Sequence, residues 1–159
     1  MEEREIAVEQ TGRRMRAPWV RLVRERGPAY PKVARPIRDA DDVMRYVHAI
    51  AEGDEVEVFR VVLLNGKHAP LGVVEVTRGS INAALVHPRE VFRTAIAMGA
   101  TSIVLTHNHP SGDPTPSDED RAITTRLRQA GDLVGIRVLD HVILGEGGRR
   151  FSMEKEGSW

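Results

Sequence analysis

Apolar residues recur along this chain with two different periods, and each period predicts one kind of element. Between Asp39 and Ile50, apolar side chains return every three or four positions behind an acidic first turn, which predicts an amphipathic helix. Residues 57–64 alternate and then become almost wholly apolar before Asn65-Gly66, which predicts a strand followed by a two-residue hairpin turn. The compact domain is therefore expected to begin with this helix.

The remaining blocks predict further strands and helices up to the C-terminus. Strands are expected over residues 71–77, 81–86, 102–106 and 136–144, and helices over residues 88 to about 99 and 118–130. The first of these two helices is expected to bury four apolar side chains, Val91, Phe92, Ala95 and Ile96. The second is expected to end at Gly131, because glycine is favoured just after the last helical residue. This alternation of strands and helices is compatible with an α/β fold.

Residues 1–36 differ from the rest of the chain in charge and proline content. Residues 1–35 carry nine Lys and Arg against five Asp and Glu, whereas the whole chain of 159 residues has 23 of each. We expect a basic, extended arm ahead of one domain over residues 37–159, because this length suits a single core. The arm is either a solvated leader or a contact for DNA or another partner, and the sequence leaves both readings open.

The chain contains no cysteine, which excludes disulfides, Cys-ligated zinc and cysteine nucleophiles. Its first residues are charged and lack the apolar core of a secretion signal, and no apolar run approaches the ~20 residues of a membrane span. A cytoplasmic protein without membrane contact is therefore expected.

The predicted strand over residues 102–106 leads directly into a polar string that can bind a metal and do chemistry with it. The string begins His107-Asn108-His109-Pro110-Ser111-Gly112 and continues with Pro116-Ser117-Asp118-Glu119-Asp120. Two imidazoles separated by one residue point the same way where the backbone is extended, and a carboxylate folded back by the loop adds a third ligand. Three such ligands without a thiolate suit a catalytic zinc. Ser117 and Asp120 also match a capping box, so a purely structural role stays open for both.

This string resembles the JAMM (MPN+) metalloprotease motif, whose members include deubiquitinating isopeptidases. The chain is most similar to the bacterial RadC-like branch of this family. The similar segments are THNHPSGDPTPSDED, VHPREVFRTAI before it and VLDHVILGEG after it, and the resemblance covers about residues 36–157. It implies an α/β, MPN (JAB/JAMM)-like fold, with a mixed sheet of about five or six strands and helices packed on it. The helix-hairpin-helix region with which RadC proteins usually begin has no counterpart here, so DNA binding by that module is not implied.

The resemblance also implies a role for each residue of the motif. His107, His109 and Asp120 match the ligands of Zn²⁺, with a water in the fourth position whose pKa zinc lowers toward ~7. Ser117 matches the serine that hydrogen-bonds the developing oxyanion of a peptide or isopeptide carbonyl.

A glutamate in the first strand of the domain is the remaining part of the implied site, as general acid and base. Glu55, Glu57 and Glu75 compete for this role. The family pattern places Glu-x-Phe before an apolar strand, and Glu57-Val58-Phe59 fits it. Glu57 is therefore predicted as the catalytic glutamate, with Glu75 in reserve.

Asp140 and His141 interrupt an otherwise apolar strand near the C-terminus. Polar residues at such positions usually satisfy each other by hydrogen bonds, which is the first interpretation. The second is that Asp140, and His141 with it, orients a ligand imidazole through its free ring nitrogen.

The predicted function is a zinc-dependent metallohydrolase, a peptidase or isopeptidase whose protein or peptide substrate the sequence does not identify. The alternative is a DNA-repair or DNA-associated factor of the RadC type with a structural or vestigial metal. An HNH nuclease is disfavoured because that motif spreads its residues over a longer unit. Zinc-dependent deamination is excluded, because those enzymes use a pair of cysteines that this chain lacks.

Overall fold

The computed structural model describes residues 35–51, 54–79 and 86–158. In chain order its elements are α1 (Ala40–Ala51), β1 (Val58–Leu64), β2 (Pro70–Arg78), α2 (Pro88–Ala97), β3 (Ser102–Asn108), α3 (Asp118–Val134), β4 (Arg137–Leu144), the 3₁₀ turn η1 (Glu146–Gly148) and β5 (Arg150–Ser152). The strand expected over residues 81–86 lies outside the described residues except for Val86, and so does almost all of the basic arm. DNA contact through that arm stays a prediction.

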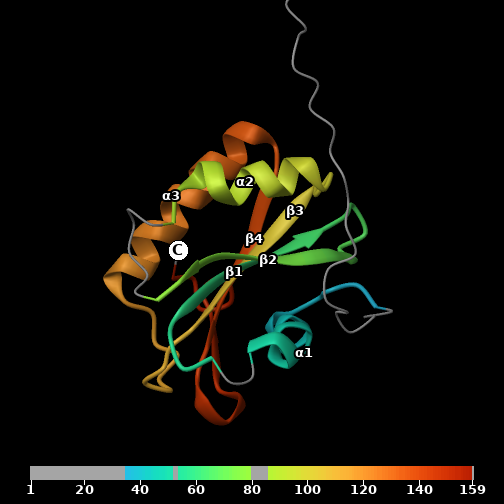
Figure 1. Ribbon diagram of the computed structural model, residues 1–159. Coiled ribbons are helices and arrows are strands. Elements are labelled where there is room, and N and C mark those ends of the chain that lie inside the picture. Colours follow the sequence, from blue (N-terminus) through green and yellow to red (C-terminus); the bar gives the residue numbers. More distant parts are fainter. Residues whose placement is uncertain (1–34, 52–53, 80–85, 159) are drawn as a thin grey trace, which may run out of the picture.

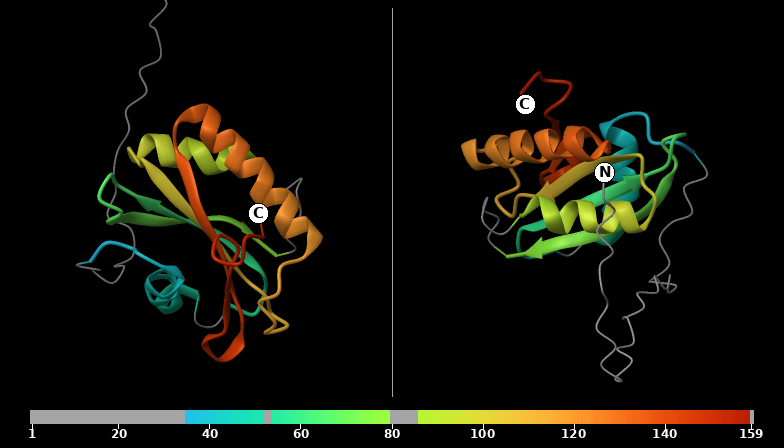
Figure 2. Two further views of the ribbon diagram at one scale, coloured as in Figure 1. Left: turned by 180° about the vertical axis from the view of Figure 1, so that it is seen from behind. Right: turned by 90° about the horizontal axis from the view of Figure 1, so that it is seen from above.

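The five described strands form one mixed sheet in the order β2-β1-β3-β4-β5. β3 lies in the centre, antiparallel to β1 and parallel to β4, and α3 makes the crossover between the two parallel strands. Helices α2 and α3 cover one face of the sheet, and α1 covers the other (Figures 1 and 2). The predicted α/β fold with a mixed sheet and packed helices is confirmed.

Alternation along the central strands divides the core into two layers. Phe59 and Leu63 of β1 pack with Ile103 and Leu105 of β3 beneath α2 and α3. Their neighbours in the sequence, such as Val104, point to the other face and pack against α1. Both faces of β1 and β3 are thus buried, which explains why these strands are almost wholly apolar rather than alternating. The next residue on the α2/α3 face after Leu105 is the first motif histidine.

Helix α3 continues beyond the predicted end at Gly131 to Val134, and Gly135 adopts the left-handed conformation that terminates it (φ 73°). Gly131 has a different role, because a Cβ built on it would lie 2.5 Å from the carbonyl oxygen of Ile136. The glycine therefore allows a close approach of helix and following chain instead of marking the helix end. The prediction was wrong because a glycine with a packing role resembles a cap in the sequence.

Two further expectations differ from the structure, and one strand was not expected. Val91, Phe92 and Ala95 are buried as predicted, but Ile96 is 60% exposed on the outer side of α2. The β1–β2 hairpin turns over residues 65–69 instead of two residues, because the Asn65 side chain accepts hydrogen bonds from two main-chain N–H groups of this loop. Strand β5 was not predicted, since three residues after a glycine-rich turn are too short for a clear period.

Within the described residues, no helix has the length and apolar character needed to cross a membrane.

Candidate metal centre

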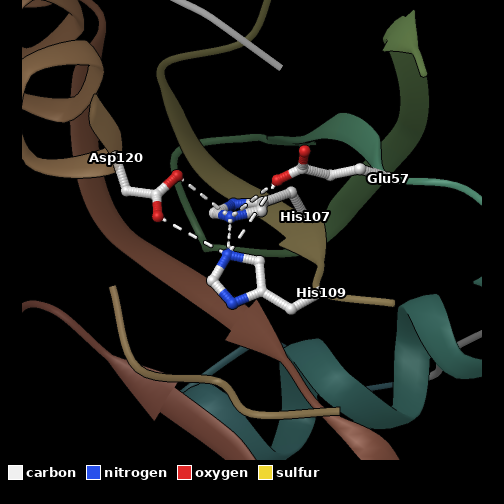
Figure 3. A group of neighbouring side chains, drawn as sticks. All are labelled: Glu57, His107, His109 and Asp120. Atoms are coloured by element: carbon white, nitrogen blue, oxygen red, sulfur yellow. Dashed lines mark hydrogen bonds and ion pairs between the residues drawn. The ribbon is translucent and has the colours of Figure 1, made fainter. Parts of the chain in front are cut away.

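His107 and His109 converge because one lies in the end of a strand and the other just beyond it. His107 is buried on the α2/α3 face of β3, stacked on Phe59 of the neighbouring strand at 6.1 Å between ring centroids. His109 follows the strand, and its main-chain N–H still donates to the carbonyl of Leu144. The Nε2 atoms of the two rings are 2.9 Å apart. The predicted juxtaposition of the imidazoles is therefore present (Figure 3).

Asp120 reaches both imidazoles from the first turn of α3. Its Oδ1 lies 3.1 Å from Nε2 of His107, and its Oδ2 lies 3.5 Å from Nε2 of His109. Ser117 fixes this carboxylate, since its N–H and hydroxyl donate to Oδ2 at 2.8 and 2.7 Å while its Oγ accepts from the Asp120 N–H. The capping box expected from the sequence is thus formed, and the same bonds aim Asp120 at the histidines.

Glu57 completes the group from the residue directly before β1. Its Oε1 is 3.7 Å from Nε2 of His107 and 3.9 Å from Nε2 of His109, so it faces the donor atoms at a slightly greater distance than Asp120 does. Asn108 holds this segment, because its amide donates to the Val56 carbonyl and its Oδ1 accepts from the Val58 N–H, both at 2.9 Å. The residue between the two histidines therefore anchors the main chain on either side of Glu57.

The other two candidate glutamates lie elsewhere. Glu75 of β2 accepts hydrogen bonds from Arg78 at 2.9 and 2.7 Å, and Arg60 lies 3.8 Å away. Its bond to Arg78 is the main reason that its pKa is lowered. Glu55 is exposed in the loop before β1. Among the described residues, the group of possible metal donors contains Glu57 and neither of these two.

His141 and Asp140 point to opposite faces of β4, and only His141 touches a predicted ligand. Its Nε2 lies 2.8 Å from Nδ1 of His107, and the ring is fully buried. Burial, followed by the charge of nearby His107, lowers the pKa of His141 well below its usual value, so the ring is neutral. Asp140 instead accepts hydrogen bonds from Ser152 and from the main-chain N–H groups of His141 and Glu154. The expectation that Asp140 orients a ligand imidazole is wrong, because alternation along the strand turns it away.

Two residues of this site were not predicted. Asn108 stands between the histidines with its side chain on the opposite side of the strand, and Thr124 lies one helical turn after Asp120 with its hydroxyl 2.6 Å from Nδ1 of His141. Thr124 lies on the buried face of α3 with Ile123 and Leu127, and its place beside these apolar positions of the helical period is the sequence signal that marks it.

The donor set fits a cation. His109 has its Nδ1 2.7 Å from the Asp113 carbonyl, which can only accept, so that nitrogen carries the proton and a neutral ring presents a lone pair at Nε2. This lone pair meets Nε2 of His107 and the carboxylate of Asp120. Burial works to raise the pKa of Asp120, but the hydrogen bond and positive charge that His107 supplies when its ring is protonated, together with the bonds from Ser117, outweigh it, so the pKa is lowered and the carboxylate is ionised at neutral pH. The imidazole lone pairs and the negatively charged carboxylate repel one another unless a proton or metal ion lies between them.

One ligand atom from each of Glu57, His107, His109 and Asp120 lies within 4.8 Å of the others, which is close enough to surround one ion. Imidazole nitrogens and carboxylate oxygens without sulfur are a donor set for zinc and similar divalent metals. The four residues can therefore hold a metal.

A groove opens beside His109, and a larger cavity lies away from the possible metal donors. The groove has a volume of about 450 Å³ and borders His109, Asn108 and the loop of residues 145–149. The second cavity, of about 570 Å³, is lined by α1, β4 and the residues around β5, and it contains none of the four possible metal donors. Of these two hollows, the groove is the one that borders a possible metal donor, His109.

Comparison with known proteins covers the part of the chain that carries this site. The model of the RadC-like JAB domain family matches residues 37–158. A UPF0758 protein of Symbiobacterium thermophilum is 58% identical over 93 residues, which are 58% of this chain and 40% of that protein. A UPF0758 protein of Moorella thermoacetica is 51% identical over 115 residues, which are 72% of this chain and 46% of that protein.

A UPF0758 protein of Pelobacter propionicus is 51% identical over 105 residues, covering 66% of this chain and 46% of the relative. The chain thus spans less than half the length of these curated relatives. The resemblance predicted from the motif is confirmed by the family match, which includes all four possible metal donors.

Proposed function

The chain belongs to the RadC-like JAB domain family, and from this membership we propose that it is a zinc-dependent peptidase or isopeptidase. The observation that carries the proposal is the convergence of Glu57, His107, His109 and Asp120 within 4.8 Å. A structural metal site needs only ligands, whereas this one also has a carboxylate at a greater distance and a groove beside it.

His107, His109 and Asp120 would hold the ion, because their atoms are the closest to one another. Three nitrogen and oxygen ligands without a thiolate favour zinc with one open coordination position. Zinc bound there would supply Lewis acidity and lower the pKa of a water toward ~7. The ionised Asp120 would offset the positive charge, and the Asp113 carbonyl would keep the proton of His109 on Nδ1, away from the ion.

Glu57 would act as the general base and then as the general acid. Its Oε1 faces the two imidazole Nε2 atoms from 3.7 and 3.9 Å, farther away than the oxygens of Asp120, so it is the carboxylate left to meet a water bound at the ion rather than the ion itself. The carboxylate would take a proton from the attacking water and pass it to the leaving amine. Asn108 would keep Glu57 in place during both transfers, since it anchors the main chain on either side.

Ser117 would donate a hydrogen bond to the oxyanion of the scissile carbonyl. Its hydroxyl is bonded to Oδ2 of Asp120 at 2.7 Å, so it has to turn away from that oxygen to reach a substrate. Asp120 keeps a second bond to the same oxygen from the Ser117 N–H, which would hold the ligand during the change. The substrate would lie in the groove beside His109.

Ser117→Ala is expected to lower the free energy of unfolding by about 1 kcal/mol, because the helix cap is lost. It is also expected to lower the rate of hydrolysis by about 10²- to 10³-fold, because the oxyanion donor is lost. Urea denaturation and the rate of peptide hydrolysis measure the two effects. Ser117→Thr keeps the hydroxyl and should restore most of both. If Ser117→Ala is destabilised but hydrolyses substrate at the wild-type rate, the serine is only a cap.

The test of the proposed function is hydrolysis before and after removal of the metal. Peptides with ordinary and with lysine-linked isopeptide bonds are incubated with the protein, and new amino termini are identified by mass spectrometry. Cleavage should disappear after treatment with a chelator and return on addition of zinc. Undiminished cleavage by protein shown to be free of metal would contradict the proposal.

A further inference from the structure

We infer that Thr124 and His141 form a hydrogen-bond relay that keeps the proton of the His107 ring on Nδ1 and leaves Nε2 open toward the metal group. Both are positioning residues, since neither lies among the four possible metal donors. The consequence for metal binding rests on the proposed function, whereas the direction of the relay rests on the hydrogen bonds and on the burial that keeps His141 neutral.

The direction begins at Thr124, whose Oγ1 lies 2.5 Å from the Asp120 carbonyl oxygen and 2.6 Å from Nδ1 of His141. A carbonyl oxygen can only accept, and a hydroxyl has one proton to donate. The thioether sulfur of Met153, 3.4 Å away, is a weak acceptor, so the Thr124 proton goes to the Asp120 carbonyl one helical turn earlier, as is common for threonine inside a helix. Its oxygen is then an acceptor, so Nδ1 of His141 carries the proton between them.

His141 transmits this direction to His107. A neutral imidazole has a single N–H, so with the proton on Nδ1 the Nε2 atom of His141 is an acceptor. Within the described part of the chain, the hydrogen bonds place Nδ1 of His107 against this atom, at 2.8 Å, so His107 must donate. Phe59 packs its ring against both imidazoles, at 6.1 Å from His107 and 5.5 Å from His141, and each ring is at most 1% exposed. The hydrogen bond between the two rings is therefore shielded from bulk solvent.

The relay matters because the position of the ring proton decides which nitrogen of His107 has a lone pair to offer. The atom that faces His109 and Asp120 is Nε2. The Asp120 carboxylate, 3.1 Å away, favours a proton on this nitrogen, and a proton held there would compete with a metal, so the relay acts against that attraction. A ligand histidine usually donates its second N–H to a carboxylate or a carbonyl. In this protein a second, neutral imidazole takes that place, and Thr124 on the helix of Asp120 ends the chain. The relay thus links the main-chain carbonyl of Asp120 to the ring of His107, through the ring nitrogen that faces away from the other possible metal donors.

Thr124→Val and Thr124→Ser test the relay as a matched pair. The ring nitrogens of His107 and His141 are observed by ¹⁵N NMR in the metal-free protein at alkaline pH, and zinc affinity is measured by competition with a chelating dye. In the wild type, both rings should carry their proton on Nδ1. Thr124→Val removes the acceptor, so protonation at Nε2 should appear and zinc affinity should fall by about 10- to 100-fold. Thr124→Ser should resemble the wild type.

The wild-type spectrum tests the inference even if Thr124→Val does not fold. A wild-type His107 protonated on Nε2 in its neutral form overturns the relay, and so does a folded Thr124→Val protein with unchanged ring shifts and unchanged affinity. Nδ1 protonation in a wild-type protein that binds no zinc supports the relay and contradicts the proposed function. The two claims therefore fail on different measurements.

Discussion

Glu57→Gln is expected to lower the rate of hydrolysis by about 10²- to 10⁴-fold while the protein still binds metal and folds normally. Glutamine keeps the size and shape of the side chain but cannot take up a proton. Glu57 lies 3.7 and 3.9 Å from the Nε2 atoms of the two histidines, whereas Asp120 comes as near as 3.1 Å. The loss should therefore fall on the proton transfer, with little change in the zinc content measured on the same samples.

Glu75→Gln is the matched control, because it makes the same change on the neighbouring strand. Glu75 contacts Arg78 and Arg60 and lies outside the possible metal group. Exposed ion pairs contribute about 0–1 kcal/mol, so this variant should retain nearly the full rate and stability. The assignment of the base fails if Glu75→Gln is the inactive variant, or if Glu57→Gln hydrolyses substrate at the wild-type rate.

Asp120→Asn is expected to weaken zinc binding by more than about 100-fold. Loss of an outer hydrogen-bond partner alone costs about 10- to 100-fold, and here the one charged residue among the three proposed ligands is removed. The effect is measurable as stabilisation, since zinc at 100 times its Kd should raise the free energy of unfolding of the wild type by about 2.7 kcal/mol. The variant should gain almost nothing at the same zinc concentration.

Asp118→Asn provides the control for this measurement, because Asp118 is exposed in the same first turn of α3. It should lose a few tenths of a kcal/mol at most through the weaker interaction with the helix dipole, and keep the full stabilisation by zinc. An Asp120→Asn protein that zinc stabilises as strongly as the wild type would remove Asp120 from the ligand set.

The parts of the fold that could be predicted are those in which one period runs without interruption. The helix from residue 40, the strands around Val61 and Val104, and the helix beginning at Pro88 were all clear for this reason. The end of α3 was not, because Gly131 serves a close contact and Gly135 the cap. Local patterns do not distinguish these two uses of glycine, since the difference depends on what packs against the helix.

The residues of the candidate site also differ in how far the sequence could predict them. His107, His109 and Asp120 lie in one short string, so the motif was enough to bring them into consideration. Glu57 lies 50 residues earlier in the chain, and the pairing of Phe59 with His107 across β1 and β3 brings it near. A sequence pattern selected Glu57 only through the family resemblance.

Contacts that depend on side-chain direction could not be predicted. Asp140 and His141 are adjacent, and the orientation of β4 alone decides that His141 meets His107 while Asp140 turns away. Asn108 and Thr124 belong to no familiar motif of metal ligands. Their roles come from hydrogen bonds between elements that are distant in the sequence.

Metal analysis of the purified protein beside His107→Ala and His109→Ala, with His87→Asn as a control, determines whether the two motif histidines hold a metal ion. Asparagine at position 87 can replace the exposed histidine that caps α2. We expect about one zinc ion per chain in the wild type and the control, and almost none in the two alanine variants. A wild-type protein that binds no metal when zinc is supplied, or a full zinc content in either alanine variant, would contradict this expectation.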